Sequence, residues 1–313
     1  CSRIPMPRHL LSLLDWSGTE IFDALKLAHN LKRKTKTGAC PKLLEGRSYA
    51  LIFHKNSLRT RVSFEVGIHQ LGGHSMILTD QDFKIGERES VRDVAKVLSR
   101  YVDGILIRTS SHETVVALAE HAEVPMVNML TDFSHPCQIL ADVLTIQEHV
   151  GTLENLRIAY LGDGNNVVNS WLNLACRIPL DLRIGTAPET QPEAALVKAV
   201  QDCGVSQVRV CHDAREAVAD AQILYTDVWA SMGEKEQARQ RGQLLQDFQI
   251  NQNLLECAAQ GVKVMHCLPA ERGREITEEV LEGANSIVLD QAENRLHAQK
   301  AVLAQLERWH RSL

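Results

Sequence analysis

The segment Phe53–Arg61 carries two arginines and two hydroxyl side chains where a buried apolar run gives way to a helical pattern. Ser57 stands at the expected N-cap, and Arg59, Thr60 and Arg61 fall in the first helical turn. The N–H groups at a helix N-terminus carry partial positive charge, so cations placed there oppose the helix dipole unless an anion binds. The pattern predicts a site for a small oxyanion such as phosphate. The alternative is an ordinary N-cap with arginines in surface salt bridges.

Two more motifs in the first half of the chain could contribute to such a site. Arg108 follows the apolar run Gly104–Ile107, and open α/β sheets bind their ligands at the carboxyl ends of strands. His135 precedes Pro136, a residue favoured at the first helical position, and Gln138 follows in the same helix. A neutral imidazole that donates to a carbonyl and an amide that accepts from an amino group would together hold a carbamoyl group. The alternatives are a capping histidine, a solvated glutamine and an exposed arginine.

The second half of the chain places polar residues after three expected strands. Leu161–Asn166 opens a helix but lacks the third glycine of a dinucleotide-binding loop, and no acidic residue ends the next strand, so we expect no nicotinamide cofactor. Thr226–Gly233 combines a carboxylate, a hydroxyl and turn N–H groups, which suit the ammonium and carboxylate of an amino acid. His266–Pro269 contains a thiol that could be a nucleophile, a ligand or a buried apolar group. Glu293–Arg295 adds a further candidate anion-binding arginine, or else a salt bridge.

Apolar runs of strand length alternate with amphipathic runs of helix length along most of the chain. This alternation predicts an α/β protein with two doubly wound parallel-sheet domains, each sheet covered by helices on both faces. We expect one domain at 1–150, a second at 151–290, and a C-terminal helix within 291–313 that packs back on the first domain. An irregular polar stretch is expected after the strand at 223–226. The expected strands are 48–54, 74–78, 104–109, 125–129, 156–161, 181–185, 207–211, 223–226, 263–268 and 286–289.

Composition excludes several classes of protein. The 313 residues are 44% apolar, and 34 Lys+Arg against 39 Asp+Glu give a net charge of −5, so we expect no nucleic-acid partner. No apolar run approaches the roughly 18 residues that span a membrane. The eight cysteines form no Cys-x-x-Cys pair, which favours reduced thiols in a cytoplasmic protein and no metal site. Because the chain begins at Cys1, an organellar matrix reached by a cleaved presequence is the alternative location.

Taken in order, six motifs resemble those of the ornithine carbamoyltransferases, within the aspartate/ornithine carbamoyltransferase family. The resemblance covers nearly the whole chain, whereas Ser-x-Arg-Thr-Arg alone would indicate only some carbamoyltransferase. It implies an enzyme of arginine and amino-acid biosynthesis that catalyses a urea cycle-type reaction, in which carbamoyl phosphate and L-ornithine give L-citrulline and phosphate without a cofactor. It also implies a homotrimer or an assembly of trimers, with domains that close on the second substrate. The motifs are 57–61, 135–138, 162–166, 227–233, 266–269 and 293–295.

The resemblance also implies roles for individual residues. The implied catalytic residues are Arg108, His135, Asp227 and Cys267, and Thr60 would join Arg108 and His135 in stabilising the oxyanion of the tetrahedral intermediate. Carbamoyl phosphate would be bound by Ser57, Leu58, Arg59, Thr60, Arg108, His135, Gln138, Cys267, Leu268 and Arg295. Ornithine would be bound by Asn166, Asp227, Ser231 and Met232.

Two positions depart from the pattern of that family, and other functions remain as alternatives. Lys84 stands where relatives commonly have glutamine, and Glu271 stands where a basic residue is common. Within the family, the acceptor could instead be putrescine, N-acetylornithine or N-succinylornithine, although the Ser231–Gly233 turn favours a free amino acid. Outside it, the incomplete glycine pattern disfavours a Rossmann-like oxidoreductase, and the intact anion and acceptor motifs disfavour a catalytically silent binding protein.

Overall fold

The computed structural model describes residues 7–81, 85–86, 89–229 and 235–312. The chain divides into two compact units. Unit 1 comprises Cys1–Leu144 and Asn294–Leu313, and unit 2 comprises Thr145–Glu293. Within the described residues, no helix is both long enough and apolar enough to cross a membrane.

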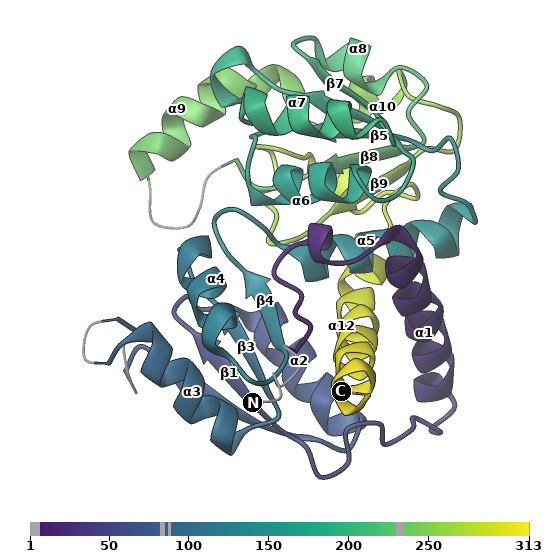
Figure 1. The fold of residues 1–313 in the computed structure, drawn as a ribbon. Coiled ribbons are helices and arrows are strands. Elements are labelled where there is room, and N and C mark those ends of the chain that lie inside the picture. Colours follow the sequence, from purple (N-terminus) through teal and green to yellow (C-terminus); the bar gives the residue numbers. More distant parts are fainter. Residues whose placement is uncertain (1–6, 82–84, 87–88, 230–234, 313) are drawn as a thin grey trace. The chain divides into compact units, whose positions relative to one another are not determined.

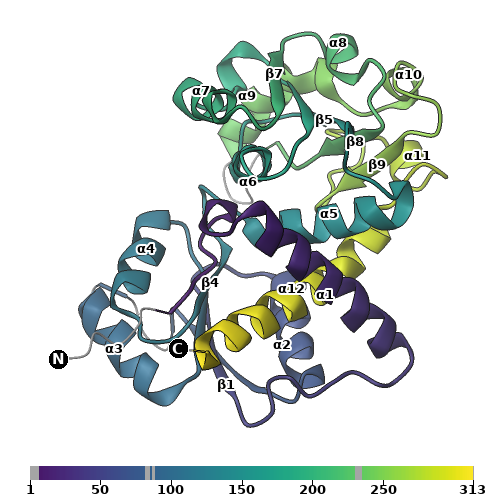
Figure 2. The same ribbon diagram turned by 45° about the vertical axis from the view of Figure 1, so that its right-hand side comes forward.

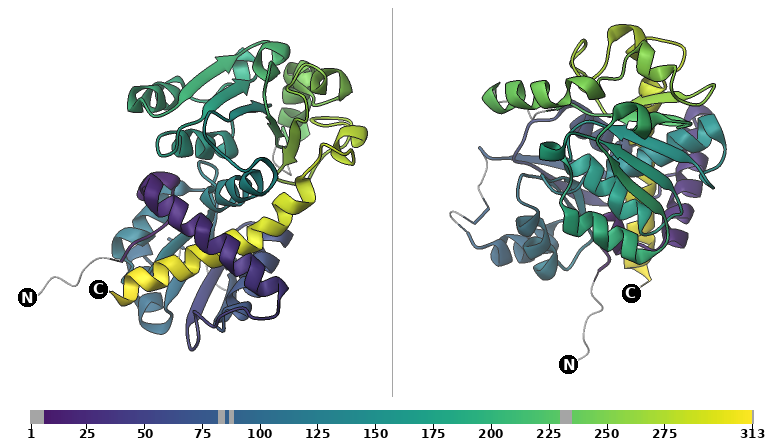
Figure 3. Two further views of the ribbon diagram at one scale, coloured as in Figure 1. Left: turned by 90° about the vertical axis from the view of Figure 1, so that its right-hand side faces the viewer. Right: turned by 90° about the horizontal axis from the view of Figure 1, so that it is seen from above.

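Among the residues described in unit 1, four parallel strands form one sheet in the order β2-β1-β3-β4. Figure 1 labels β1, β3 and β4 of this sheet. Helices α3 and α4 cover one face, where Ala50, Ile52 and Ile105 are buried. Helices α1, α2 and α12 cover the other face, and α1 and α12 lie side by side there (Figures 2 and 3). The strands are β1 (Ser48–Phe53), β2 (His74–Thr79), β3 (Gly104–Arg108) and β4 (Met126–Leu130), and the helices are α1 (Gly18–Lys36), α2 (Leu58–Gln70), α3 (Val91–Tyr101) and α4 (His112–His121), with a 3-10 turn at Leu13–Asp15. Helices α5 (Pro136–Val150) and α12 (Val288–Arg311) belong to unit 1 for most of their length, and residues 145–150 and 288–293 of them belong to unit 2.

Among the residues described in unit 2, five parallel strands form a second sheet in the order β7-β6-β5-β8-β9. Tyr160 and Tyr225 stack at 5.8 Å on one face, and Trp171 of α6 packs against Tyr225. Ala159 and Leu161, which alternate with Tyr160, are buried on the opposite face. The strands are β5 (Arg157–Leu161), β6 (Asp181–Gly185), β7 (Gln207–Cys211), β8 (Ile223–Thr226) and β9 (Lys263–His266), and the helices are α6 (Asn166–Ala175), α7 (Ala194–Cys203), α8 (Ala214–Val218), α9 (Lys235–Leu245), α10 (Gln252–Leu255) and α11 (Glu278–Leu281), with 3-10 turns at Pro188–Thr190 and Gln246–Phe248.

The α/β class, the two parallel sheets and the return of the C-terminal helix to the first domain are confirmed. Two local predictions are wrong. The run 286–289 is not a strand, because Ser286 forms a single bridge to Val264 and the helical hydrogen bond from Gln291 N to Ile287 O begins α12 at once. The stretch after β8 contains helix α9, which its polar composition concealed.

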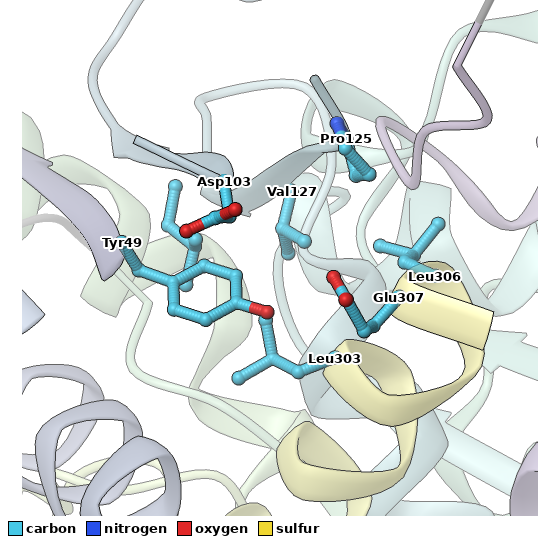
Figure 4. Close-up of a pocket in the computed structure, with 8 residues that line it drawn as sticks. Tyr49, Asp103, Pro125, Val127, Leu303, Leu306 and Glu307 are labelled. Atoms are coloured by element: carbon cyan, nitrogen blue, oxygen red, sulfur yellow. The ribbon is translucent and has the colours of Figure 1, made fainter. Parts of the chain in front are cut away.

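A small pocket lies at the amino end of the unit 1 sheet (Figure 4). Tyr49, Asp103 and Glu307 supply its polar lining. Glu307 is only 4% exposed, and its carboxylate accepts from Arg47 Nε at 2.7 Å, while Arg47 also donates to Asp103 at 2.7 Å. Because Arg47 directly precedes β1 and Glu307 lies on α12, these ion pairs join α12 to the sheet.

Candidate active site

Helix α2 of unit 1 begins as the sequence predicted, directly after β1. Ser57 is the N-cap, and its Oγ accepts the Thr60 N–H at 3.3 Å. The Thr60 side chain is 1% exposed, whereas Leu58 is 74% exposed. The helix therefore presents its first N–H groups and one buried hydroxyl at the carboxyl end of the sheet.

The Thr60 hydroxyl is shared by two arginines from distant parts of the chain. Arg108 Nη1 lies 3.4 Å from Thr60 Oγ1, and Arg295 Nη2 lies 3.2 Å from the same oxygen. Arg295 Nη1 also donates to Gln138 Oε1 at 2.7 Å. Four predicted site residues, from α2, β3, α5 and α12, thus meet within unit 1.

The electrostatics of this cluster favour an anion. Burial, and after it the charges of Arg295 and Arg59, lower the pKa of Arg108 to about 10, against a weaker opposing effect of Asp132. Arg108 Nε is buried and has no hydrogen-bond partner among the described residues. An anion bound between these guanidinium groups would relieve their repulsion and supply the missing acceptor.

His135 lies beside these cations as a neutral imidazole. The residue is 5% exposed and directly precedes α5. Burial lowers the pKa of His135 well below its ordinary value, and the charges of Arg295 and Arg108 lower it further. Its imidazole is therefore uncharged near neutral pH and has one ring N–H that can donate to a carbonyl oxygen.

A buried carboxylate that sequence reasoning missed orients Gln138. Asp142 is fully buried in α5, and its Oδ1 accepts from Gln138 Nε2 at 2.8 Å. Because the amide nitrogen faces Asp142, the amide oxygen faces Arg295. The i, i+4 spacing on one helix was the only sequence signal for this pair.

Arg61 does not join the cluster, contrary to the expectation from its motif. Its side chain is exposed and pairs with Glu65 one turn along α2, at 3.3 Å. Residues 59 and 61 point in different directions because neighbouring helical positions are about 100° apart. Arg59 is half-buried and interacts with Arg108, whereas Arg61 forms an ordinary surface ion pair.

Unit 2 gathers a second set of predicted residues around Asp227, which follows β8 and is 7% exposed. The thiol of Cys267, after β9, donates to Asp227 Oδ1 at 2.7 Å, and the Val228 N–H donates to the same oxygen at 2.8 Å. Asn165 Nδ2 donates to Asp227 Oδ2 at 2.8 Å. Asn166 is half-buried and begins α6.

His266 and Glu275 lie behind the Cys267–Leu268 turn. His266 Nδ1 accepts the Leu268 N–H at 2.9 Å, so the ring proton lies on Nε2, which faces Glu275 Oε1 at 3.0 Å. Both side chains are fully buried. They support Leu268, whose φ of 58° is in the left-handed region.

Asp227, His266 and Cys267 are a group of possible metal ligands within the described residues. Their donor atoms are already engaged: the thiol donates to Asp227, and both ring nitrogens of His266 have partners. These contacts need no cation.

Four further positions were singled out in the sequence. Ser231, Met232 and Lys84 lie outside the described residues. Glu271 is exposed and pairs with Arg274 at 2.5 Å. Among the site residues that were predicted and are described, those of the first half of the chain and Arg295 belong to unit 1, and Asn166, Asp227, Cys267 and Leu268 belong to unit 2.

Comparisons with known proteins agree with both sets. Residues 8–148 match the carbamoyl-P binding domain of aspartate/ornithine carbamoyltransferase, and residues 154–306 match its Asp/Orn binding domain. The ornithine carbamoyltransferase of Methanoculleus marisnigri is 46% identical over 96% of this chain and 97% of its own. The anabolic ornithine carbamoyltransferase of Pyrococcus furiosus is 46% identical over 95% of each chain. A solved ornithine carbamoyltransferase from the same organism superposes with a TM-score of 0.91 at 44% identity, covering 96% of both chains. The chain belongs to the aspartate/ornithine carbamoyltransferase family.

Proposed function

We propose that this protein is an ornithine carbamoyltransferase, an enzyme that transfers the carbamoyl group of carbamoyl phosphate to the δ-amine of L-ornithine, giving L-citrulline and phosphate. The observation that carries the donor is the convergence of Arg108 and Arg295 on the Thr60 hydroxyl, beside a neutral histidine. The relatives named ornithine carbamoyltransferases, which match almost the whole chain, support the acceptor.

The phosphate of the donor binds at the N-terminus of α2. Ser57 and Thr60 supply hydroxyls, the N–H groups of the first turn supply the dipole, and Arg59 and Arg108 supply charge. Leu58 contributes its backbone, which accords with its exposed side chain. Arg295 binds the donor from α12.

The carbamoyl group binds beside the phosphate. His135 and Gln138 hold it, and backbone carbonyls at Cys267 and Leu268 accept from its amino group. As the δ-amine attacks, charge develops on the carbonyl oxygen, where Arg108, Thr60 and His135 stabilise it. A neutral His135 donates its ring N–H to this oxygen.

The transfer forms one bond and breaks one. The δ-nitrogen forms a bond to the carbamoyl carbon, the bond from that carbon to the phosphate oxygen breaks, and the departing phosphate takes one proton from the nitrogen. The free amine has a pKa near 10, so it must lose its own extra proton before attack. Asp227 and Cys267 bind near this amine, and Asn166, Asp227, Ser231 and Met232 hold the amino-acid end.

A panel of acceptor amines tests this function. The protein is incubated with carbamoyl phosphate and either ornithine, putrescine or N-acetylornithine, and the ureido product is measured. We expect product with ornithine and little with the other two amines. A preference for putrescine or the acetylated amine would refute the acceptor assignment.

We further propose that the chain forms a homotrimer, or an assembly of trimers. Leu58, Val62 and Val66 form an exposed apolar stripe along α2, with exposures of 74%, 49% and 37%. Met76, on the edge strand β2, is also exposed. A charge in this stripe, as in Val62→Lys, should lower the mass measured by light scattering from a multiple of three chains to that of one chain. A wild-type protein that is monomeric at assay concentration would contradict the proposal.

The cytoplasm and arginine biosynthesis are the location and pathway that we propose. The anabolic name of the Pyrococcus furiosus relative supports the biosynthetic direction. Initial rates in both directions test it: citrulline synthesis should exceed phosphorolysis of citrulline at equal substrate concentrations.

A further inference from the structure

The amide of Asn165 makes hydrogen bonds in two directions. Its Oδ1 accepts the N–H groups of Val167 and Val168 at 2.9 and 3.3 Å, which makes Asn165 the N-cap of α6. Its Nδ2 donates to Asp227 Oδ2 at 2.8 Å. One side chain therefore joins the start of α6 to the carboxylate at the end of β8.

The helix N-terminus dictates which way this amide faces. Only the amide oxygen can accept the two backbone N–H groups, so the amino group must face Asp227. The Tyr160 hydroxyl, fully buried beneath the turn, donates to Asp163 O at 3.1 Å and lies 3.4 Å from Asn165 Oδ1. These donors therefore fix the amide oxygen of Asn165, and its amino group donates to the Asp227 carboxylate.

The oxygens of Asp227 are divided between different donors as a result. Oδ2 accepts from Asn165, while Oδ1 accepts from the Cys267 thiol and the Val228 N–H. We propose that Asn165 is a positioning residue for the acceptor amine, because its hydrogen bond to Oδ2 fixes the plane of the Asp227 carboxylate. This inference rests on the function proposed above.

One substitution of Asn165 separates its role as the N-cap of α6 from its hydrogen bond to Asp227. Asn165→Ser keeps an N-cap of equal rank but is too short to donate to Asp227. Asn251→Ser is the matched control, because Asn251 caps α10 in the same unit by accepting the Leu254 N–H at 3.0 Å. A loss of one hydrogen bond to a charged group predicts a rise of roughly tenfold or more in the KM for ornithine of Asn165→Ser. The KM for carbamoyl phosphate and the Tm should stay near those of the wild type, and Asn251→Ser should match the wild type throughout.

Asn165→Asp adds a pH readout that a purely structural cap would not give. It keeps the cap but places a second carboxylate against Asp227, and two such groups must share a proton. Its activity relative to the wild type should therefore fall as the pH rises and the shared proton is lost. A wild-type KM for ornithine in Asn165→Ser, or equal losses for both substrates together with a lowered Tm, would overturn the proposal. A wild type that makes no citrulline would instead refute the function proposed above.

A second and independent feature is a pair of thiols at the ends of two neighbouring helices. Cys176 is the C-cap of α6 and Cys203 is the last residue of α7, and the two thiols interact with each other. Ser206 holds the surrounding segments together, since its Oγ lies 2.7 Å from Ala175 O and accepts the Leu180 N–H at 2.9 Å. Cys203 is exposed and Cys176 is half-buried, and both are free thiols.

We infer that Cys176 and Cys203 form a reversible disulfide with a low-molecular-weight disulfide as oxidant. The Cys203 thiolate attacks a sulfur of the oxidant and releases one thiolate, which leaves a mixed disulfide on Cys203. Cys176 then gives its proton to solvent and attacks the Cys203 sulfur, which releases the second thiolate. Two protein thiols are oxidised and one small disulfide is reduced to two thiols. Burial raises the pKa of Cys176 to about 12, so the second step is the slower one.

Peptide mapping after incubation with oxidised glutathione tests this site. We expect a cross-link between the peptides that contain Cys176 and Cys203, reversed by dithiothreitol. Cys176→Ser should retain a glutathione adduct on Cys203, Cys203→Ser should form neither product on these peptides, and the control Cys257→Ser should cross-link like the wild type. Free thiols at both positions, or an adduct on wild-type Cys203 that never resolves, would overturn the inference.

Discussion

The thiol of Cys267 donates a hydrogen bond to Oδ1 of Asp227 across 2.7 Å. The two residues are 40 positions apart in the sequence and follow adjacent parallel strands, β8 and β9. Parallel strands place their carboxyl ends at one edge of the sheet, so residues that follow neighbouring strands meet there. This contact makes Cys267 a donor to a carboxylate, which is a role that does not require a thiolate nucleophile.

Replacement of Cys267 should therefore depend on hydrogen bonding rather than on nucleophilicity. Cys267→Ser retains a donor to Asp227 and should keep most of the activity. Cys267→Ala leaves the Asp227 oxygen with one donor fewer and should weaken ornithine binding by about 1.5–3 kcal/mol, which is roughly tenfold to a hundredfold in KM. Steady-state kinetics with varied ornithine distinguish the two variants. Equal inactivation of both would indicate that sulfur chemistry is essential.

Thr60 should be sensitive to the loss of its hydroxyl and insensitive to the loss of its methyl group. Thr60→Val removes the oxygen that accepts from Arg108 and Arg295. Because the valine neither orients the two guanidinium groups nor offers a hydroxyl to the phosphate, the affinity for carbamoyl phosphate should fall by about 1–3 kcal/mol. Thr60→Ser should bind nearly as the wild type does. Isothermal titration with carbamoyl phosphate measures both, and identical affinities for Val and Ser would contradict the role of the hydroxyl.

Arg59 and Arg61 form a matched pair within the first two turns of α2. Arg59→Ala should weaken carbamoyl phosphate binding by roughly 1.5–3 kcal/mol, since it removes a charge-assisted contact. Arg61→Ala removes the same charge from the same helix but breaks only an exposed ion pair with Glu65, which is worth at most about 0.5 kcal/mol. Isothermal titration of both variants with carbamoyl phosphate should show a large loss of affinity for Arg59→Ala alone. A comparable loss for the second would indicate a general effect of net charge.

Conformational stability should decrease as the pH falls from about 6.5 to about 4. Burial lowers the pKa of His9 to about 4, and the pKa of His135 is also well below its ordinary value of 6.5. In this window the unfolded chain binds protons at these histidines while the folded chain does not, so stability rises with pH. Each such histidine changes the free energy of unfolding by up to about 1.4 kcal/mol per pH unit.

Urea unfolding at a series of pH values measures this dependence. His9→Gln, which can still accept the Met126 N–H that His9 Nδ1 now accepts at 3.0 Å, should flatten the slope between about pH 4 and about pH 6.5. His29→Gln is the control, because His29 is a half-buried histidine of α1 that lies outside the site. An unchanged slope in His9→Gln would contradict the assignment of the lowered pKa.

Much of the fold could be predicted because local patterns and long-range packing agree. The strand Gly104–Arg108 is apolar up to its last residue, and in the structure it lies between two other strands with helices on both faces. The run at 286–289 has a similar composition but is too short and too close to α12 to pair. Apolar composition alone cannot distinguish these outcomes, because they depend on which partner strand is within reach.

The candidate site could be predicted where a residue acts through its own motif. Ser57 is the N-cap of α2, and a serine directly before a helical pattern predicts such a cap. Asn165 and Asp142 were missed as functional residues because their partners, Asp227 and Gln138, determine their roles, and a linear sequence does not display such contacts. The prediction for Arg61 was wrong because the motif does not show its ion pair with Glu65, which keeps the Arg61 side chain on the surface.

The amounts of citrulline and phosphate formed from carbamoyl phosphate and L-ornithine test the central claim most directly. The account predicts that the protein produces the two in equal molar amounts, and that neither forms above the background rate without ornithine. Release of phosphate without citrulline, or citrulline formation that does not depend on the protein, would contradict it.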